Sequence, residues 1–131
     1  MKIALPTKKD CKYIRKKLRI FYEANRIYQE YPTYQHIEFH RAMLRMFTFF
    51  QLPTPKIEWI KSFGLMFGQP ETKILGQCTT DGIIKLLTPY FHNTNFEGWL
   101  DTVYHEIGHY VLWVDTEKNA KEFASKIRLR G

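Results

Sequence analysis

Residues 101–109 read Asp101-Thr102-Val103-Tyr104-His105-Glu106-Ile107-Gly108-His109, inside a longer run in which apolar residues recur three or four positions apart. This period predicts an amphipathic helix over about residues 95–114. The expected apolar stripe consists of Leu100, Val103, Tyr104, Ile107, Val111 and Val114. His105 and His109 lie together beside this stripe, so the helix presents two imidazoles on one face.

The segments around this helix predict an α+β fold. Helical periodicity marks residues 7–31, 33–52 and about 116–129, and β-prone runs mark residues 56–60, 74–80 and 83–88. Thr7 is expected to cap the first helix, and Thr94 with Glu97 has the spacing of a capping box for the third. Asp81-Gly82 joins the last two β-prone runs and predicts a hairpin turn. The expected order is two helices, a small antiparallel sheet, and two further helices.

Length and composition fit one domain over residues 1–131, with a helical part at 1–55 and a second part at 56–131. A hydrophobic content of 44% is enough to build a core without disulfide bonds. Cys11 and Cys78 are expected to be reduced and buried. No signal-peptide pattern and no apolar run of about 20 residues is present, which predicts an intracellular, cytoplasmic protein without a membrane span.

The formal net charge is +7, and much of it falls in residues 8–26. The basic side chains there are Lys8, Lys9, Lys12, Arg15, Lys16, Lys17, Arg19 and Arg26. A positive field of this kind favours polyanions, so nucleic acid or an acidic protein is a candidate partner. The alternative is an ordinary solvated helix face with no partner.

The pattern His105-Glu106-Ile107-Gly108-His109 indicates a metal site with catalytic chemistry. Residues four apart share a helix face, so both imidazoles can reach one metal ion, here Zn²⁺. Glu106 is rotated away from that face and is expected to accept a proton from water instead of binding the metal. Gly108 would let another backbone approach this helix closely.

A catalytic zinc site needs a third protein ligand, and no histidine follows His109. Asp115, Glu117 and Glu122 are the candidates. Glu117 shares the apolar face of the last helix, because it precedes Ala120 by three residues, whereas Glu122 lies on the polar face. A carboxylate on an inner face needs a partner, which favours Glu117 and leaves Asp115 as the second choice.

Other polar residues give weaker indications. Asp101, four residues before His105, could accept a hydrogen bond from that imidazole, or be a surface residue. One of Tyr90, His92 and Tyr110 could stabilise an oxyanion, although packing roles explain them equally well. His36 and His40 are also four apart, but Glu38 between them lies on the opposite side of the helix, so we expect surface residues.

Residues 74–124 resemble the core of a zincin metallopeptidase. The strand-turn-strand of residues 75–86 precedes the helix with its His-Glu-x-x-His motif, and both also resemble SprT-like proteases. The later segment Glu117-x-x-Ala120-x-x-Phe123-Ala124 is similar to one in gluzincins of the ImmA/IrrE type, where the first Glu binds zinc. The resemblance therefore implies a minimal zincin core over residues 56–131, with Glu117 as the third ligand.

The motif and the resemblance together predict a zinc-dependent peptidase that acts on a peptide or protein. His105, His109 and Glu117 would hold Zn²⁺, and Glu106 would be the general base. Two alternatives remain open from the sequence. One is a nucleic-acid-associated binding module with a structural or vestigial zinc site, and the other is a regulatory protein that acts on a single partner.

Overall fold

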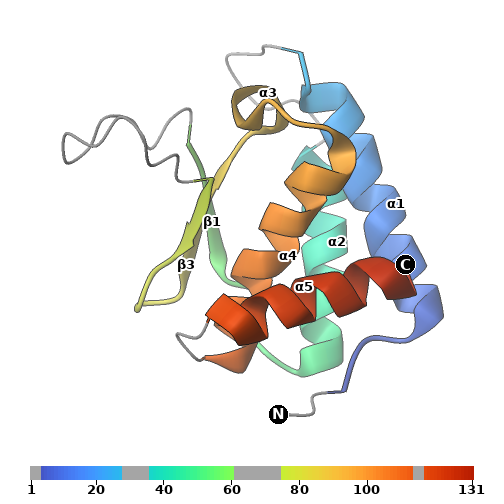
Figure 1. Cartoon of the computed structure of the whole chain (residues 1–131). Coiled ribbons are helices and arrows are strands. Elements are labelled where there is room, and N and C mark those ends of the chain that lie inside the picture. Colours follow the sequence, from blue (N-terminus) through green and yellow to red (C-terminus); the bar gives the residue numbers. More distant parts are fainter. Residues whose placement is uncertain (1–3, 28–35, 61–74, 114–116) are drawn as a thin grey trace.

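The computed structural model describes residues 4–27, 36–60, 75–113 and 117–131. Its elements are α1 (Lys8–Asn25), α2 (His36–Phe50), β1 (Lys56–Ile60), β2 (Gly76–Cys78), β3 (Ile83–Leu87), α3 (Pro89–His92), α4 (Phe96–Leu112) and α5 (Glu117–Arg130). A three-stranded sheet lies against a layer of helices, and α5 crosses α4 on one side of that layer (Figure 1). The α+β fold predicted from the sequence is confirmed.

The sheet is mixed and not antiparallel as predicted. Its strand order is β1-β3-β2, with β2 antiparallel and β1 parallel to the central strand β3. Parallel strands need a long connection, which the chain between residues 60 and 83 supplies. A hairpin signal identifies only one pair of neighbours, so the sequence pattern left the direction of β1 undetermined. The consequence for the site is that β2 becomes an edge strand.

The predicted Asp81-Gly82 turn joins β2 to β3. Gly82 adopts a φ of 83°, and its N–H donates to Thr79 O over 3.1 Å. The Thr79 hydroxyl donates to the Asp81 carboxylate and accepts from the Ile83 N–H. The left-handed backbone at Gly82 is one that other residues seldom adopt, which explains glycine at this position.

The first two helices form where periodicity places them, with shorter ends than expected. Thr7 caps α1 by accepting from the Asp10 N–H. The helix ends at Asn25, whose side-chain amide donates to Phe21 O, and not at Tyr31. Residues 28–35, which include the other expected helix end at Thr33, lie outside the described residues. α2 ends at Phe50 and not at Leu52, because Gln51 adopts a φ of 56°.

The start of α4 differs from the predicted capping box. Asn95, and not Thr94, is the cap, and its side chain accepts from the Gly98 N–H over 2.9 Å. Glu97 instead pairs with Arg15 of α1. The sequence allows either Thr94 or Asn95 as the cap of α4. The pairing of Glu97 with Arg15 of α1 favours Asn95. Thr88 caps the short helix α3, which the sequence analysis did not predict although Pro89 follows a capping threonine there.

The core is aromatic where the helices meet the sheet. Phe21 of α1 stacks on Trp59 of β1 and on Trp99 of α4, with ring centroids 4.9 and 5.6 Å apart. Phe39 of α2 packs edge-on against Trp59. These rings are large, flat and buried or half-buried, so they fix the helices on one face of the sheet. The predicted inner face of α5 is buried as well.

No helix in the described ranges is long and apolar enough to cross a bilayer. Both cysteines are free, with Cys11 buried and Cys78 half-buried.

Candidate metal centre

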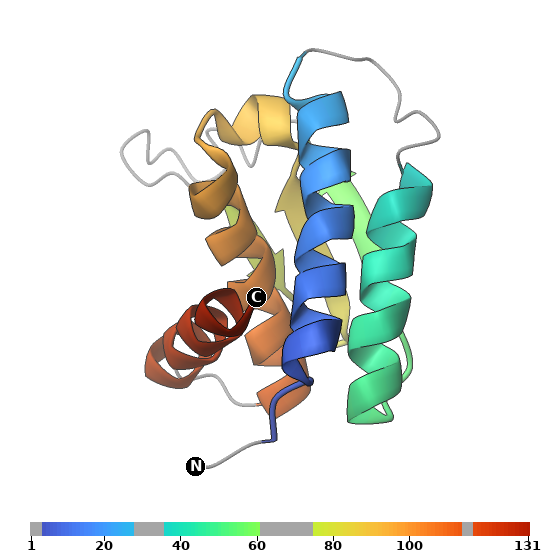
Figure 2. The same cartoon turned by 90° about the vertical axis from the view of Figure 1, so that its right-hand side faces the viewer.

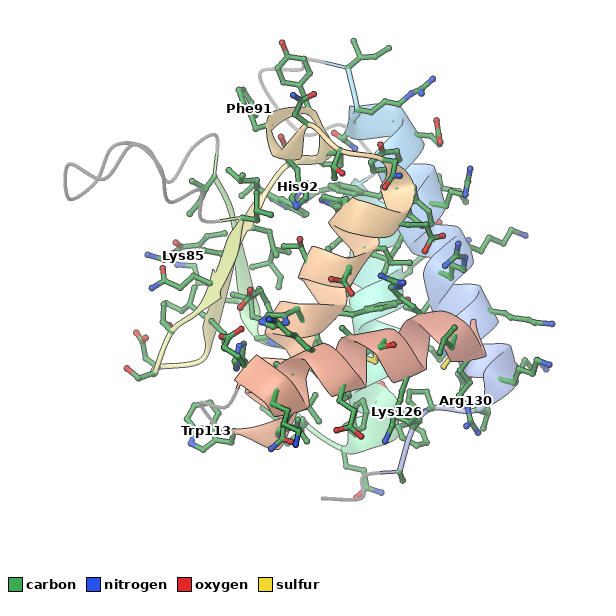
Figure 3. All side chains as sticks on the ribbon, in the orientation of Figure 1. Lys85, Phe91, His92, Trp113, Lys126 and Arg130 are labelled. Atoms are coloured by element: carbon green, nitrogen blue, oxygen red, sulfur yellow. The ribbon has the colours of Figure 1, made fainter. Side chains whose placement is uncertain are left out.

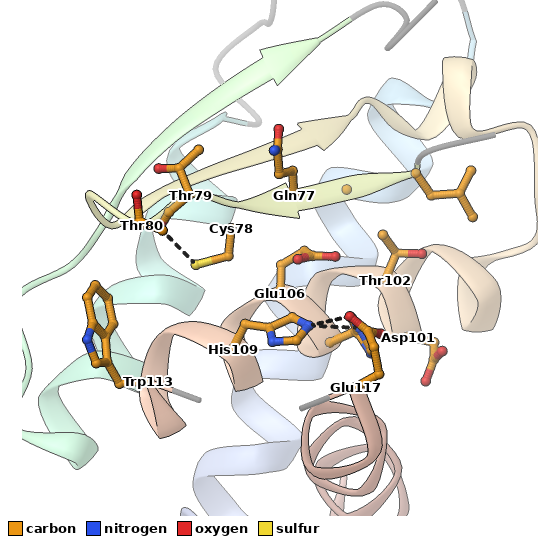
Figure 4. A pocket seen from close by; sticks show the side chains of 13 residues that line it. Gln77, Cys78, Thr79, Thr80, Asp101, Thr102, Glu106, His109, Trp113 and Glu117 are labelled. Atoms are coloured by element: carbon orange, nitrogen blue, oxygen red, sulfur yellow. Dashed lines mark hydrogen bonds and ion pairs between the residues drawn. The ribbon is translucent and has the colours of Figure 1, made fainter. Parts of the chain in front are cut away.

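Three side chains from two helices meet at one point. His105 Nε2 lies 2.8 Å from Glu117 Oε2, and His109 Nε2 lies 3.0 Å from Glu117 Oε1. The two imidazole nitrogens are 3.2 Å apart. Figure 4 shows His109 and Glu117 facing one another in a cleft that His105 also lines. In the described part of the chain, these residues form a group able to hold a metal ion.

His105, His109 and Glu117 lie together because of where α4 ends and how α5 crosses it. Trp113 adopts a φ of 51° and its N–H donates to His109 O, which stops α4 one turn after His109. α5 then crosses α4 with Ala120 against Gly108. A Cβ on Gly108 would lie 3.3 Å from Ala120 Cα and 3.0 Å from the Phe123 ring. Glu117, one turn before Ala120, is therefore carried over the two imidazoles.

Of the other two candidates for a third ligand, the structure describes only Glu122. Glu122 is exposed on the polar side of α5 and pairs with Lys126 at 2.9 Å. Asp115 lies outside the described residues. Of the described candidates, Glu117 is the one next to the imidazoles. Its side chain is 65% exposed while the two histidines are largely covered, so the prediction that Glu117 lies on the inner face of the last helix is wrong.

The donor set suits zinc. In a tetrahedral zinc site with ligand distances of about 2.0–2.1 Å, neighbouring donor atoms are roughly 3.3 Å apart. The two imidazole nitrogens are 3.2 Å apart, close to this edge length, and they lie 2.8 and 3.0 Å from two different oxygen atoms of Glu117. Two imidazoles and one carboxylate are also a ligand set used by catalytic zinc sites, which keep a fourth position for water or substrate.

Glu106 faces a different direction from the two histidines. Its side chain is turned toward β2, where a Cβ on Gly76 would lie 2.9 Å from Glu106 Cγ (Figure 4). Burial raises the Glu106 pKa to about 7, with the charge of Glu117 adding to this and His109 opposing it. A carboxyl group with such a pKa can both accept and release a proton near neutral pH.

β2 forms the wall of the cleft opposite α4. The cleft has a volume of about 730 Å³, and the ligand group lines it together with Glu106 and β2. Leu75 and Thr79 bond to β3 through Leu75 O and Thr79 N–H. Bonding alternates along an antiparallel strand, so the N–H and C=O groups of Gly76 and Cys78 point away from β3. They form the outer edge of the sheet beside the cleft.

Sequence reasoning missed several residues of the cleft wall. Cys78 lines it, and burial followed by the charge of Glu106 raises its pKa to about 11, so the thiol stays protonated at neutral pH. Thr102 and Trp113 lie toward opposite ends of the cleft (Figure 4). Trp113 is 63% exposed, which is unusual for such a large apolar ring. Only its position just beyond His109 could have indicated it.

Asp101 does not support His105 in the expected way. Although Asp101 lines the cleft, its carboxylate accepts from Arg128 of α5 over 3.1 Å. Arg128 also lies 3.9 Å from Glu97. Asp101 thus helps to hold α5 across α4, a role that spacing along one helix does not reveal.

The three oxyanion candidates lie elsewhere, and none is among the residues that line the cleft. His92, the last residue of α3, is buried, and its Nε2 lies 2.8 Å from the Thr102 hydroxyl (Figure 3). The Tyr110 hydroxyl donates to Pro53 O, and Tyr90 is exposed. His92 and Tyr110 each contact a cleft residue, because the Tyr110 ring packs edge-on against Trp113.

The second histidine pair is only partly at the surface. His40 is exposed as expected. His36 is half-buried, with its ring 5.9 Å from Phe21 and 5.6 Å from Trp59, and burial lowers its pKa. The prediction that both are surface residues is therefore wrong for His36, because α2 turns this residue toward the aromatic core.

Compared with protein-family models, with curated proteins and with solved structures, the chain matches none of them.

Proposed function

We propose that the protein is a zinc-dependent peptidase. One observation carries the proposal: two imidazoles and a carboxylate converge in a cleft that also contains a buried glutamate and the edge of a sheet. Surface histidines and acids seldom combine all of these features by chance. A structural zinc site, in contrast, is closed by four protein ligands.

His105, His109 and Glu117 would hold the ion. When bound, Zn²⁺ acts as a Lewis acid and makes water at the site more acidic. The side chains of the protein would carry out the proton transfers, and Glu106 is the main residue for this role.

Glu106 lies between the ligand group and β2, where water and a substrate carbonyl would meet. Its carboxylate accepts a proton from the attacking water and then delivers it to the nitrogen of the leaving amine. The burial of Glu106 raises its pKa, which helps the carboxyl group to hold the proton before this return step.

The outer edge of β2 would align the substrate. An extended peptide can pair with the outward N–H and C=O groups of Gly76 and Cys78, as an added strand. Gly76 has no side chain, and this keeps β2 close to Glu106. The pairing involves only backbone atoms, so it favours a peptide substrate over other amides or esters.

The first test is the metal content of the purified chain and of two single variants. Wild type is expected to contain about one zinc per chain, measured by elemental analysis, and His109→Ala little. His40→Ala removes an exposed histidine of α2 and is the matched control. The zinc site is refuted if wild type lacks stoichiometric metal or if both variants lose it equally.

Peptidase activity requires a second test because metal binding alone does not establish hydrolysis. Wild type and Glu106→Gln are incubated with a mixed library of unstructured peptides, and new amino termini are identified by mass spectrometry. Cleavage by wild type alone supports the proposal. Zinc binding without cleavage of any library peptide would favour a protein restricted to one partner.

A further inference from the structure

The outward side of α1 carries a group of exposed cations, and one of them, Arg19, also lies over the Phe96 ring of α4, 5.0 Å from its centroid. Lys8, Lys9, Lys12, Lys16 and Arg19 are exposed, and they form the group called here the basic stripe. At 100° per residue they fall within an arc of about 100° on the helix surface. Among the described residues, none of the five forms an ion pair.

The remaining cations of α1, and Arg26 just after its end, differ from the stripe because each has an acidic partner. Arg15 pairs with Glu97, Lys17 with Glu38, and Arg26 with Glu23. Asp10, one of the two acids of α1, pairs with Arg45 of α2. The available acids are thus engaged elsewhere, and the stripe retains its full positive charge.

The end of α5 extends this surface. Gly131 lies against the start of α1, where an added Cβ would be 3.0 Å from Cys11 O and 3.6 Å from Arg15 Cβ. The neighbouring Arg130 is exposed. Figure 2 shows α1 and the C-terminal end of α5 on the same side of the molecule, with the sheet behind them. Two elements therefore contribute cations to one face.

We propose that the basic stripe binds the phosphate backbone of double-stranded nucleic acid. From Lys8 to Arg19 the helix rises about 17 Å, roughly the axial length of five base pairs of a duplex, and each of the five cations of the stripe can neutralise one phosphate within that length. Four of the five stripe residues are lysines, which act as point charges, so contact with phosphates and not reading of bases is expected.

The other polyanions fit this surface less well. A helix that binds membranes needs a free apolar face, whereas Cys11, Ile14, Leu18 and Phe21 of α1 are buried in the core. An acidic protein would present its charges in an irregular pattern. The five cations form one continuous band along the helix, which suits a linear partner of uniform charge.

This inference is independent of the zinc site. The stripe lies on the outer side of the helical layer, while the cleft opens beside β2 (Figures 1 and 2). A bound duplex would leave the cleft accessible, so the protein could act on a polypeptide while attached to nucleic acid.

The test measures binding of a fluorescent 20-base-pair duplex by anisotropy, across a series of salt concentrations. For wild type we expect a slope of log K against log salt of about −4 to −5, from roughly five phosphate contacts. The triple variant Lys8→Gln/Lys12→Gln/Lys16→Gln should reduce the slope by about 3 and weaken binding at least about tenfold near 50 mM salt.

The matched control is Lys118→Gln/Lys121→Gln/Lys126→Gln, at exposed positions of α5. Each triple variant removes three positive charges and so lowers the net charge from +7 to +4. Glutamine preserves helix formation, and circular dichroism checks the fold. An equal loss in the control, or no saturable binding by wild type near 50 mM salt, overturns the proposal.

Poly-L-glutamate serves as the competing acidic chain. The duplex should bind more tightly than this polymer at an equal concentration of charges. Tighter, stripe-dependent binding of poly-L-glutamate would assign the surface to an acidic protein and refute the assignment to nucleic acid.

Discussion

Two helices of this chain carry histidines four residues apart, and only one of the pairs becomes a candidate site. On α4, His105 and His109 converge, with their Nε2 atoms 3.2 Å apart and Glu117 bonded to both. On α2, His36 packs among aromatic rings and His40 is exposed to solvent. The spacing along the sequence is the same in both helices.

The two histidine pairs differ because a different helix packs against each of them. α5 passes over α4 at Gly108 and brings a carboxylate to the imidazoles. α2 packs against α1, which brings Phe21 to His36 and Lys17 to Glu38. An i, i+4 pair can therefore supply two ligands, but a second element must supply the third ligand and the surrounding cleft.

The largest expected effect is on the peptidase rate, and it distinguishes Glu106, beside the histidine pair of α4, from Glu38, between the histidines of α2. Glu106→Gln should lower the peptidase rate by about 10²- to 10⁴-fold, because it removes the proton acceptor and donor, and should leave zinc content unchanged. Glu38→Gln, which removes the partner of Lys17 and Arg41 on α2, should leave the rate unchanged. Equal rates for the two variants would remove Glu106 from the mechanism.

The second largest expected effect is on zinc affinity, and it distinguishes Glu117 from Glu122, two glutamates of α5. Glu117→Gln should weaken zinc binding by about 100-fold or more, since it removes a charged ligand. Glu122→Gln, whose partner is Lys126, should not change zinc affinity. Titration with a competing chelator gives both affinities. If Glu122→Gln had the larger effect, the third ligand would be misassigned.

The third prediction concerns the close contact between α4 and α5 at Gly108. Gly108→Leu should destabilise the fold by about 1–3 kcal/mol, because the new side chain meets Phe123 and the backbone of Ala120. Replacing glycine in an exposed helix normally stabilises it, so the sign of the change is diagnostic. Lys121→Leu adds the same side chain on the exposed side of α5 as a control. Urea unfolding measures both, and a more stable Gly108→Leu protein would contradict the close crossing.

The smallest expected effect concerns His36. Burial lowers its pKa in the folded state, so below about pH 6.5 the unfolded chain binds more protons at this residue. The stability that His36 contributes is complete above that pH and decreases as the pH falls toward the folded-state pKa. His36→Gln should therefore lessen the drop in Tm between pH 7 and 5.5 by at most about 2 °C. His40→Gln should leave the drop unchanged; an equal effect of both variants would count against the buried position of His36.

Much of the fold could be predicted because the signals are local. Thr7 caps α1, Asp81-Gly82 forms the hairpin turn, and the inner face of α5 is buried as periodicity indicates. Predictions failed where two local patterns competed. Thr94 and Asn95 both suit a cap, and the choice between them depends on contacts of Glu97 with α1.

The same division applies to the candidate site. That His105 and His109 share a face and that Glu106 is turned from them could be predicted, since both follow from the pitch of one helix. The periodicity of the last helix also favoured Glu117 over Glu122, with Asp115 as the second choice. The packing of the helices and strands was needed to place Glu117 over the imidazoles, to make β2 an edge strand beside Glu106, and to pair Asp101 with Arg128. Those relations depend on how separate elements pack, and periodicity describes one element at a time.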